Sequence, residues 1–182
     1  KIKKKKSKKK IKLLDVGAAN GMRLNYIREK ISKKNIEYYG VEPSTKAIKS
    51  NPYKEIKIKK GTADNLPYGD EVFDIVTFSF SLYLCDDYLL PKIVLETLRV
   101  LKKNSHIIIF DFYEKKLLYK DYKYLSKIKI RKMDNSKIFT GFPTIEKIKE
   151  QVIPYNLFYN FQYQNLYKSD DKLAIHILKK KF

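Results

Sequence analysis

Residues that stabilise a fold through covalent or metal bonds are scarce in this sequence. It contains one cysteine, Cys85, which excludes an internal disulfide framework and fits a reducing compartment, so we expect a cytoplasmic protein. Its two histidines, His106 and His176, lie far apart in the sequence within predicted strands. No spacing of histidine, cysteine and aspartate suggests a zinc site, and strand histidines are most often packing residues. We therefore expect no metal centre.

Long apolar runs and arginine are also scarce. No run of about 18 apolar residues is present, so we expect no segment that spans a bilayer. No apolar segment follows the basic N-terminus, so we do not expect a secretory signal there. The net charge of +20 comes from 36 lysines and only 4 arginines. Because arginine makes the bidentate contacts with phosphates and base edges, nucleic acid is a weaker candidate partner than a small molecule.

Lysine is concentrated at the start of the chain, where residues 1–12 contain nine of them. We expect residues 1–10 to form a basic, flexible arm, because a run of this kind is more often solvated than bound to nucleic acid or a membrane. Residues 11–182 show no internal repeat and no linker rich in glycine, serine or proline. Their number suits a single domain with a substantial core.

The most informative stretch is residues 13–21, which read LLDVGAANG. An apolar run typical of a strand ends at Asp15 and turns through Gly17 and Gly21 into a helical pattern at Met22–Ile31. Such a strand, glycine turn and helix present backbone N–H groups and a helix N-terminus to a ligand. The spacing D-x-G-x-x-x-G differs from the G-x-G-x-x-G of dinucleotide-binding folds.

Strand-like and helix-like segments alternate beyond this motif. The predicted strands are Glu37–Glu42, Ile56–Lys59, Asp70–Ser79 and His106–Phe112, with a predicted amphipathic helix at Pro91–Leu101. This alternation predicts βαβ units, a parallel sheet and an α/β fold. Ligands of such sheets bind beyond the carboxyl ends of the strands, where Asp15, Glu42, Asp64 and Ser79 are expected to converge.

Together these motifs resemble those of class I S-adenosylmethionine-dependent methyltransferases, and in particular the methyltransferase type 11 kind. The resemblance covers about residues 11–112. Residues 61–86 and 132–139 are similar to a largely uncharacterised bacterial subgroup. The resemblance implies a Rossmann-like, doubly wound, mostly parallel seven-stranded sheet with an antiparallel last strand.

The resemblance also implies a role for individual residues. Asp15 and Gly17 would serve the methionine part of the cofactor, with Ser79 lining the same end, and Gly21 would allow close approach of the backbone. Glu42 would hold the ribose hydroxyls. The adenine would bind the Asp64 carboxylate and the Ala63 N–H. The full implied cofactor set is Asp15, Gly17, Ala18, Gly21, Glu42, Pro43, Ala63, Asp64, Asn65, Ser79 and Phe80.

The segment after the fifth predicted strand has little periodicity. We interpret Tyr113–Phe142, rich in lysine and tyrosine, as an insertion over the substrate side. A short helix is expected at Thr144–Val152. The strands Asn160–Tyr167 and Lys172–Leu178 are expected to form the closing hairpin around a Ser-Asp-Asp turn.

The acceptor is less clear from the sequence than the cofactor. The Asn/Asp-Pro-Pro-Tyr sequence of amino-methylating DNA enzymes is absent. Asp111 ends an apolar strand, where burial could raise its pKa, so it is a candidate general base; the alternative is a structural carboxylate bonded to loop N–H groups. Tyr83 is a second catalytic candidate. The candidate substrate residues are Tyr83, Tyr113 and Lys132, although the tyrosines could instead be core or lid aromatics.

We expect an enzyme that transfers a methyl group from S-adenosylmethionine to a small molecule, such as a sugar or another metabolite, and releases S-adenosylhomocysteine. One alternative is an RNA or protein methyltransferase that uses the basic arm. Another is a cofactor-binding module without catalytic activity. The oligomeric state stays open.

Overall fold

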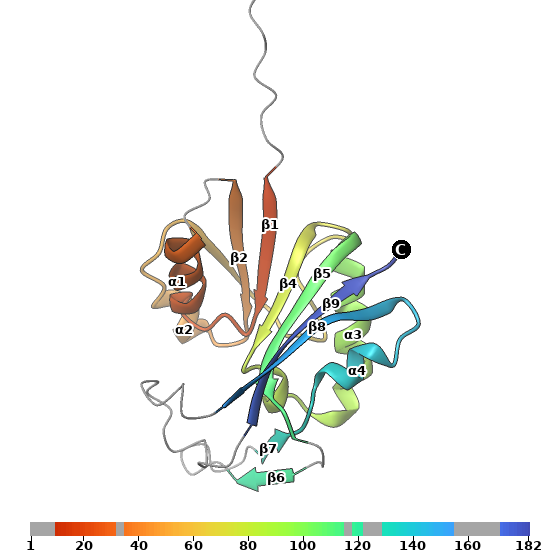
Figure 1. The fold of residues 1–182 in the computed structure, drawn as a ribbon. Coiled ribbons are helices and arrows are strands. Elements are labelled where there is room, and N and C mark those ends of the chain that lie inside the picture. Colours follow the sequence, from red (N-terminus) through yellow and green to blue (C-terminus); the bar gives the residue numbers. More distant parts are fainter. Residues whose placement is uncertain (1–9, 32–34, 115–117, 122–128, 155–171) are drawn as a thin grey trace, which may run out of the picture.

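Seven strands form a single sheet at the centre of the structure (Figure 1). They are β1 (Ile11–Val16), β2 (Ile36–Glu42), β3 (Ile56–Lys60), β4 (Phe73–Ser79), β5 (Leu101–Phe112), β8 (Ile145–Pro154) and β9 (Lys172–Lys180). Their order in the sheet is β3-β2-β1-β4-β5-β9-β8. Neighbouring strands from β3 to β5 pair in parallel, whereas β9 pairs antiparallel with both β5 and β8. The predicted seven-stranded, mostly parallel sheet with an antiparallel last strand is confirmed.

The computed structural model describes residues 10–31, 35–114, 118–121, 129–154 and 172–182. The basic arm predicted at residues 1–10 therefore lies almost entirely outside the described residues. None of the helices within the described part of the chain combines the length and the apolar character needed to cross a membrane.

Helices pack on both faces of the sheet. They are α1 (Met22–Ile31), α2 (Thr45–Lys49), α3 (Leu90–Val100) and α4 (Ser136–Thr140), with short 3-10 turns η1 (Leu82–Leu84) and η2 (Asp87–Leu89). Successive strand residues point to opposite faces. Leu13 accordingly joins the apolar cluster that contains Leu24 of α1, whereas Leu14 joins the cluster that contains Ile93 of α3. The sheet is therefore doubly wound, with α1 and α3 on opposite faces.

The predicted elements of the first 112 residues are confirmed, with small shifts at their ends. The predicted helix at Pro91–Leu101 is α3, in which Pro91 occupies the first turn, where its missing N–H costs nothing. The predicted strand His106–Phe112 is the second part of β5, which already begins at Leu101. Leu101 is fully buried and pairs with Phe73, so tertiary packing extends the strand.

The prediction of a helix at Thr144–Val152 is wrong, because residues 145–152 belong to strand β8. The helical pattern places Ile145, Ile148 and Val152 on one face, but only Ile145 is buried and the other two are exposed. Pairing along the whole length of β9 satisfies the backbone of this segment instead.

The closing hairpin is confirmed only in part. Lys172–Leu178 lies within β9, as expected, and this strand is antiparallel to its neighbours. Its partner on the side away from β5 is β8, however, and not the predicted strand Asn160–Tyr167, which lies outside the described residues.

The predicted insertion at Tyr113–Phe142 contains regular structure. Its strands β6 (Leu118–Asp121) and β7 (Lys129–Lys132) form an antiparallel pair, and α4 follows them. Figure 1 shows this pair beyond the end of the sheet at which β5 finishes. That end is where the parallel strands β1, β2 and β4 also finish. The substrate-side role of this segment stays a prediction.

Candidate functional site

The loop after β1 requires glycine at two turn positions, Gly17 and Gly21, whose φ angles are +85° and +82°. A Cβ on Gly17 would lie 2.6 Å from the Cβ of Ser81, so no side chain fits there. The N–H groups of Gly17 and Ala18 both donate to the carbonyl of Val41, at 2.9 and 3.0 Å. The loop is thus held against β2 and leaves bare backbone at the carboxyl edge of the sheet.

Glu42 ends β2 beside this loop, and its carboxylate is held by two backbone donors. The N–H of Ala19 donates to Oε2 and the N–H of Ser44 donates to Oε1, both at 2.9 Å. Ser44 also caps α2 through its Oγ, which accepts from the N–H of Ala47. Each carboxylate oxygen can still accept a further hydrogen bond, so Glu42 can bind a ligand carrying paired hydroxyls.

Asp15 lies near the end of β1, just before the glycine turn, with only 1% of its surface exposed. Thr77 on β4 donates its hydroxyl to Oδ1 at 2.7 Å, while the buried Oδ2 has no hydrogen-bond partner. Burial raises the pKa of Asp15 to about 6, and the positive charge of Arg23 opposes that rise. An unsatisfied buried carboxylate oxygen is costly in a structural site, so Asp15 is suited to receive a donor from a ligand.

The loop at residues 61–70 carries Asp64, which lies partly buried at its first turn. The hydroxyl of Thr62 holds the pKa of Asp64 below its usual value, and the Lys92 ammonium 3.4 Å from Oδ2 acts in the same direction. Asn65 closes this turn by donating its N–H to the carbonyl of Thr62. Ala63 lies half-buried between them. Asp64 therefore stays ionised and can accept hydrogen bonds at the first turn of this loop.

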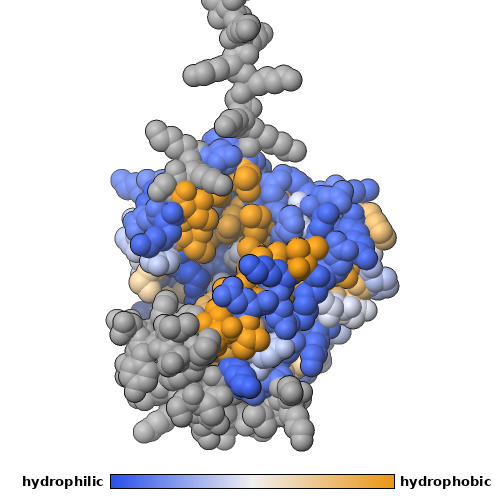
Figure 2. Space-filling view, viewed as in Figure 1, coloured by the Kyte–Doolittle hydropathy of each residue, from blue (hydrophilic) through white to orange (hydrophobic). Residues whose placement is uncertain are grey.

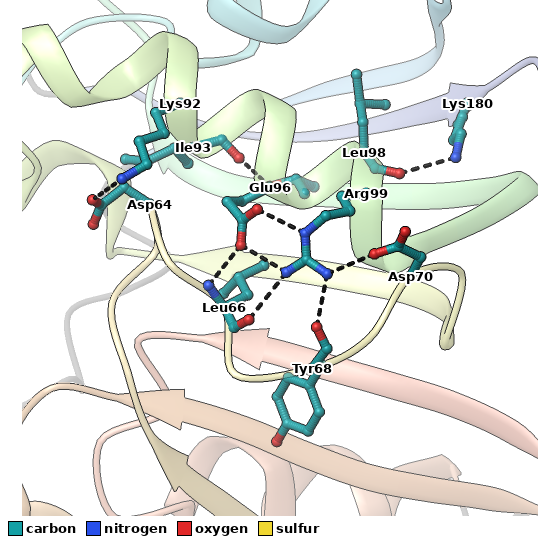
Figure 3. Close-up of polar contacts among 11 residues, drawn as sticks. Asp64, Leu66, Tyr68, Asp70, Lys92, Ile93, Glu96, Leu98, Arg99 and Lys180 are labelled. Carbon is teal, nitrogen blue, oxygen red and sulfur yellow. Dashed lines mark hydrogen bonds and ion pairs between the residues drawn. The ribbon is translucent and has the colours of Figure 1, made fainter.

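Two side chains of α3 hold this loop in place (Figure 3). Glu96 accepts the N–H of Leu66 at 2.8 Å, and Arg99 pairs with Glu96 at 2.7 Å. Arg99 also donates to the carbonyls of Tyr68 and Leu66, at 2.8 and 3.1 Å, and to Asp70. A single guanidinium thus fixes three points of a segment that has no helix or strand of its own.

Ser79 is the last residue of β4 and Phe80 follows it, next to the first turn of α1. Phe80 has a φ of 55°, which turns the chain sharply at this point. Arg23 of α1 donates to the carbonyl of Ser79, and its guanidinium lies 5.8 Å from the centroid of the Phe80 ring. Ser81 then donates its hydroxyl to the carbonyl of Val16 at 2.7 Å, which ties the end of β4 to the end of β1.

Four aromatic rings gather beside this turn. Phe80 packs edge-on against Phe110 with centroids 4.5 Å apart, and Tyr83 packs against Phe112 at 5.4 Å. Tyr83 and Phe112 are buried, whereas Phe80 and Phe110 are only partly buried. Figure 2 shows apolar surface gathered near the middle of one face of the molecule, with hydrophilic surface around it. The rings form an apolar wall next to the Ser79 end of the site.

Asp111 lies on the opposite face of β5 from these rings, because strand residues alternate. It is 1% exposed, and its oxygens accept the N–H of Phe112 and the side-chain amide of Asn135, both at 2.8 Å. Asp111 therefore anchors the start of α4. The base role predicted for it stays a prediction.

Tyr113 contacts a polar cluster that the sequence did not predict. Its hydroxyl donates to Glu150 at 2.9 Å. The buried His176 has Nδ1 3.2 Å from Glu150 and Nε2 3.2 Å from Asp134, and burial lowers the pKa of this histidine. Asp134, Glu150 and His176 have the spacing of metal ligands. The Glu150 carboxylate, however, is already paired with the Lys147 ammonium at 2.6 Å. The substrate candidate Lys132 lies in β7.

The structure thus brings the predicted cofactor residues to one edge of the sheet, at the ends of β1, β2 and β4 and in the loop after β3. Sequence reasoning missed three supporting side chains there, namely Arg23, Thr77 and Ser81. Arg23 could have been recognised from the sequence, since it stands two residues beyond the last glycine of the turn. Thr77 and Ser81 could not have been recognised in this way, because each contacts a residue more than 60 positions away in the sequence.

Comparison with protein families gives a match over this part of the chain. Residues 14–109 match the family model described as a methyltransferase domain. That range contains every residue of the predicted cofactor set.

Curated relatives match shorter stretches. A demethylmenaquinone methyltransferase of Alkalihalophilus pseudofirmus is 34% identical over 64 residues, which are 35% of this chain and 26% of that protein. An uncharacterised methyltransferase of Bacillus subtilis, YcgJ, is 28% identical over 106 residues, which are 56% of this chain and 41% of that protein. The chain thus spans well under half the length of these two relatives.

Solved structures share the fold across nearly the whole chain. A SAM-dependent methyltransferase from Methanosarcina mazei has a TM-score of 0.71 and 14% identity, and the match covers 97% of this chain and 94% of that one. A 1,6-didemethyltoxoflavin-N1-methyltransferase from Burkholderia thailandensis, solved with 1,6-didemethyltoxoflavin and S-adenosylhomocysteine, has a TM-score of 0.71 and 12% identity over 96% of this chain and 72% of that one.

Proposed function

We propose, from the premise that this chain belongs to the methyltransferase domain family, that it transfers a methyl group from S-adenosylmethionine to a small molecule. The observation that carries the proposal is the pairing of the glycine turn with Glu42. The turn leaves bare backbone at the edge of the sheet, and the Glu42 carboxylate is held beside it by two backbone donors. A nucleoside with free ribose hydroxyls suits this arrangement.

The rest of the cofactor set supports the same ligand. Asp64 is a charged acceptor that can take the adenine amino group, and the nearby N–H of Ala63 can donate to the ring. Asp15 has an unsatisfied buried oxygen at the other end of the site, where the methionine part would lie. The donor is S-adenosylmethionine and the product is S-adenosylhomocysteine.

Positioning accounts for most of what the protein contributes to such a reaction. When bound, S-adenosylmethionine would supply a methyl group on a positively charged sulfur, and the residues at this edge of the sheet would hold that group in line with the acceptor atom. The ring of Phe80 and the buried Tyr83 exclude water from the Ser79 end of the site. A proton lost by the acceptor passes to solvent or to a base. Of the two predicted candidates, Tyr83 lies beside Phe80, whereas Asp111 lies on the opposite face of β5 with both oxygens hydrogen-bonded.

The acceptor that the geometry favours is a small molecule with an aromatic ring. The partly exposed rings of Phe80 and Phe110 offer flat apolar surface close to the cofactor end of β4. One curated relative is named a demethylmenaquinone methyltransferase. Within the expected class of small molecules, we therefore favour an aromatic acceptor over a sugar.

Calorimetry tests the cofactor and a turnover screen tests the acceptor. We expect binding of S-adenosylmethionine and S-adenosylhomocysteine and none of NAD, and methylation of quinols or heteroaromatic rings in a panel that also contains sugars and RNA. Tight binding of NAD without response to the methyl donor would refute the family-based function. Binding without turnover of any panel member would favour the non-catalytic module.

A matched pair of variants on β2 tests the role of Glu42. Glu42→Ala should weaken S-adenosylhomocysteine binding by about 1.5–3 kcal/mol, the usual scale for hydrogen bonds to a charged group. Glu37→Ala removes the same side chain near the opposite end of that strand, where it pairs with Lys10. It should leave the affinity unchanged. Equal affinities for the two variants would remove Glu42 from the site.

A further inference from the structure

Arg23 lies in the predicted cofactor site but has no role in the set that the sequence implied. It stands in the first turn of α1, and its guanidinium donates to the carbonyl of Ser79 while lying over the ring of Phe80. A guanidinium carries five N–H donors in a planar fork, and the bond to Ser79 uses one of them. The others are available at the end of β4.

Asp15 provides a negative charge near this positive one. Its Oδ1 is bonded to Thr77, and its buried Oδ2 has no hydrogen-bond partner, although the Arg23 charge is close enough to influence it. The two groups are therefore held apart, each by a different neighbour on β4. A purely structural ion pair would bring the guanidinium onto the unsatisfied oxygen, since that contact would offset the cost of burying it.

Neighbouring but unpaired opposite charges are complementary to a zwitterion. An α-amino acid group carries an ammonium, which needs acceptors, and a carboxylate, which binds a guanidinium through two parallel hydrogen bonds. Phe80 adds an apolar ring beside the guanidinium, with 5.8 Å between the ring centroid and Cζ. The arrangement thus fits the amino acid end of S-adenosylmethionine better than it fits a neutral group.

We propose that Arg23 binds the α-carboxylate of the cofactor, so that Arg23 and Asp15 together form the subsite for its amino acid end. This inference rests on the proposed function. It assigns a specificity-determining role to Arg23, because ligands that keep the adenosine but lack the carboxylate would lose this contact.

Two ligands and three variants test the assignment by calorimetry. S-adenosylhomocysteine contains the amino acid end, whereas 5′-methylthioadenosine keeps the adenosine and the thioether and lacks it. Arg23→Met removes the guanidinium and keeps an unbranched apolar stem. Arg28→Met is the matched control on the same helix, where Arg28 donates to Asn25 within α1. Arg23→Lys keeps the charge but loses the planar fork.

We expect Arg23→Met to weaken S-adenosylhomocysteine binding about 10- to 100-fold, the scale of charge-assisted hydrogen bonds, while 5′-methylthioadenosine binding stays within about threefold. Arg23→Lys should lie between the wild type and Arg23→Met. Arg28→Met should leave both affinities unchanged.

The alternatives give different results. If Arg23→Met weakens binding of both ligands equally, Arg23 shapes the loop as a whole. If binding of S-adenosylhomocysteine is unchanged, Arg23 does not touch the cofactor. Either result overturns the inference and leaves the proposed function intact. A wild-type protein that binds neither ligand overturns the proposed function and the inference with it. Circular dichroism of each variant separates a lost contact from a lost fold.

Discussion

Asp15 combines a cost to folding with its proposed part in ligand binding. Its pKa in the folded protein is about 6, above the usual 3.8, because the carboxyl is buried. A raised folded-state pKa contributes stability that is fully present below pH 3.8 and is lost as the pH rises through 6. The rise in pKa from 3.8 to about 6 therefore lowers the free energy of unfolding by roughly 3 kcal/mol at neutral pH and above, relative to its value below pH 3.8.

Asp15→Asn should therefore stabilise the fold at pH 8 and have little effect at pH 4. We expect a gain of about 1–3 kcal/mol in urea unfolding at pH 8, because the neutral amide avoids a buried charge. Glu55→Gln removes the same charge at an exposed position and is the control. S-adenosylhomocysteine should bind the Asp15→Asn protein more weakly. A loss of stability at pH 8 would mean that Asp15 is paired in the folded protein.

At the scale of elements, α3 positions the loop that carries Asp64. Arg99 joins three points of that loop to the helix, so Arg99→Met should cost stability and also weaken binding of S-adenosylhomocysteine several-fold. Lys102→Met also breaks an ion pair, with Asp74 at 2.7 Å, but near the amino end of β4. It should cost stability alone. Thermal unfolding and calorimetry on both variants separate the two effects, and equal affinities would show that the loop keeps its shape without Arg99.

The segment at Tyr113–Phe142 is the element in which we expect substrate choice to reside. The carboxyl edge of the sheet is already lined by the residues of the predicted cofactor set, and loops on a rigid scaffold commonly carry specificity. Tyr113→Ala or Lys132→Ala should reduce turnover while cofactor affinity stays within about threefold. Steady-state kinetics and calorimetry measure the two quantities. An equal loss of cofactor binding would place this segment in the donor site or in the core.

At the scale of the whole molecule, the charge of +20 raises the question of nucleic-acid binding. If the acceptor is a small molecule, deletion of residues 1–10 should leave cofactor affinity and turnover within about twofold, because basic arms of this kind cost little to remove. Binding to RNA, if any, should be weak and should fall steeply with salt, as expected for contacts with the phosphate backbone alone. Collapse of activity together with RNA affinity would favour the RNA methyltransferase.

The local pattern of the sequence determined the glycine turn, Glu42 and the alternation of strands and helices. These features depend on residues close together in the chain: Gly17 and Gly21 are required by positive φ angles, and Glu42 directly ends a strand. Parallel strands separated by helices then bring their carboxyl ends to one edge. The meeting of these residues at one edge of the sheet could therefore be predicted from the sequence alone.

Only the tertiary structure decided the features that depend on contacts between distant segments. Strand β8 forms because β9 offers a full row of backbone partners, although the same residues also have helical spacing. Arg23 meets Ser79, and Asp111 meets Asn135, across gaps of 56 and 24 residues. The type and spacing of side chains along the sequence do not determine these long-range contacts. The contacts arise because the completed sheet brings distant strands together, and because polar groups that become buried there need hydrogen-bond partners.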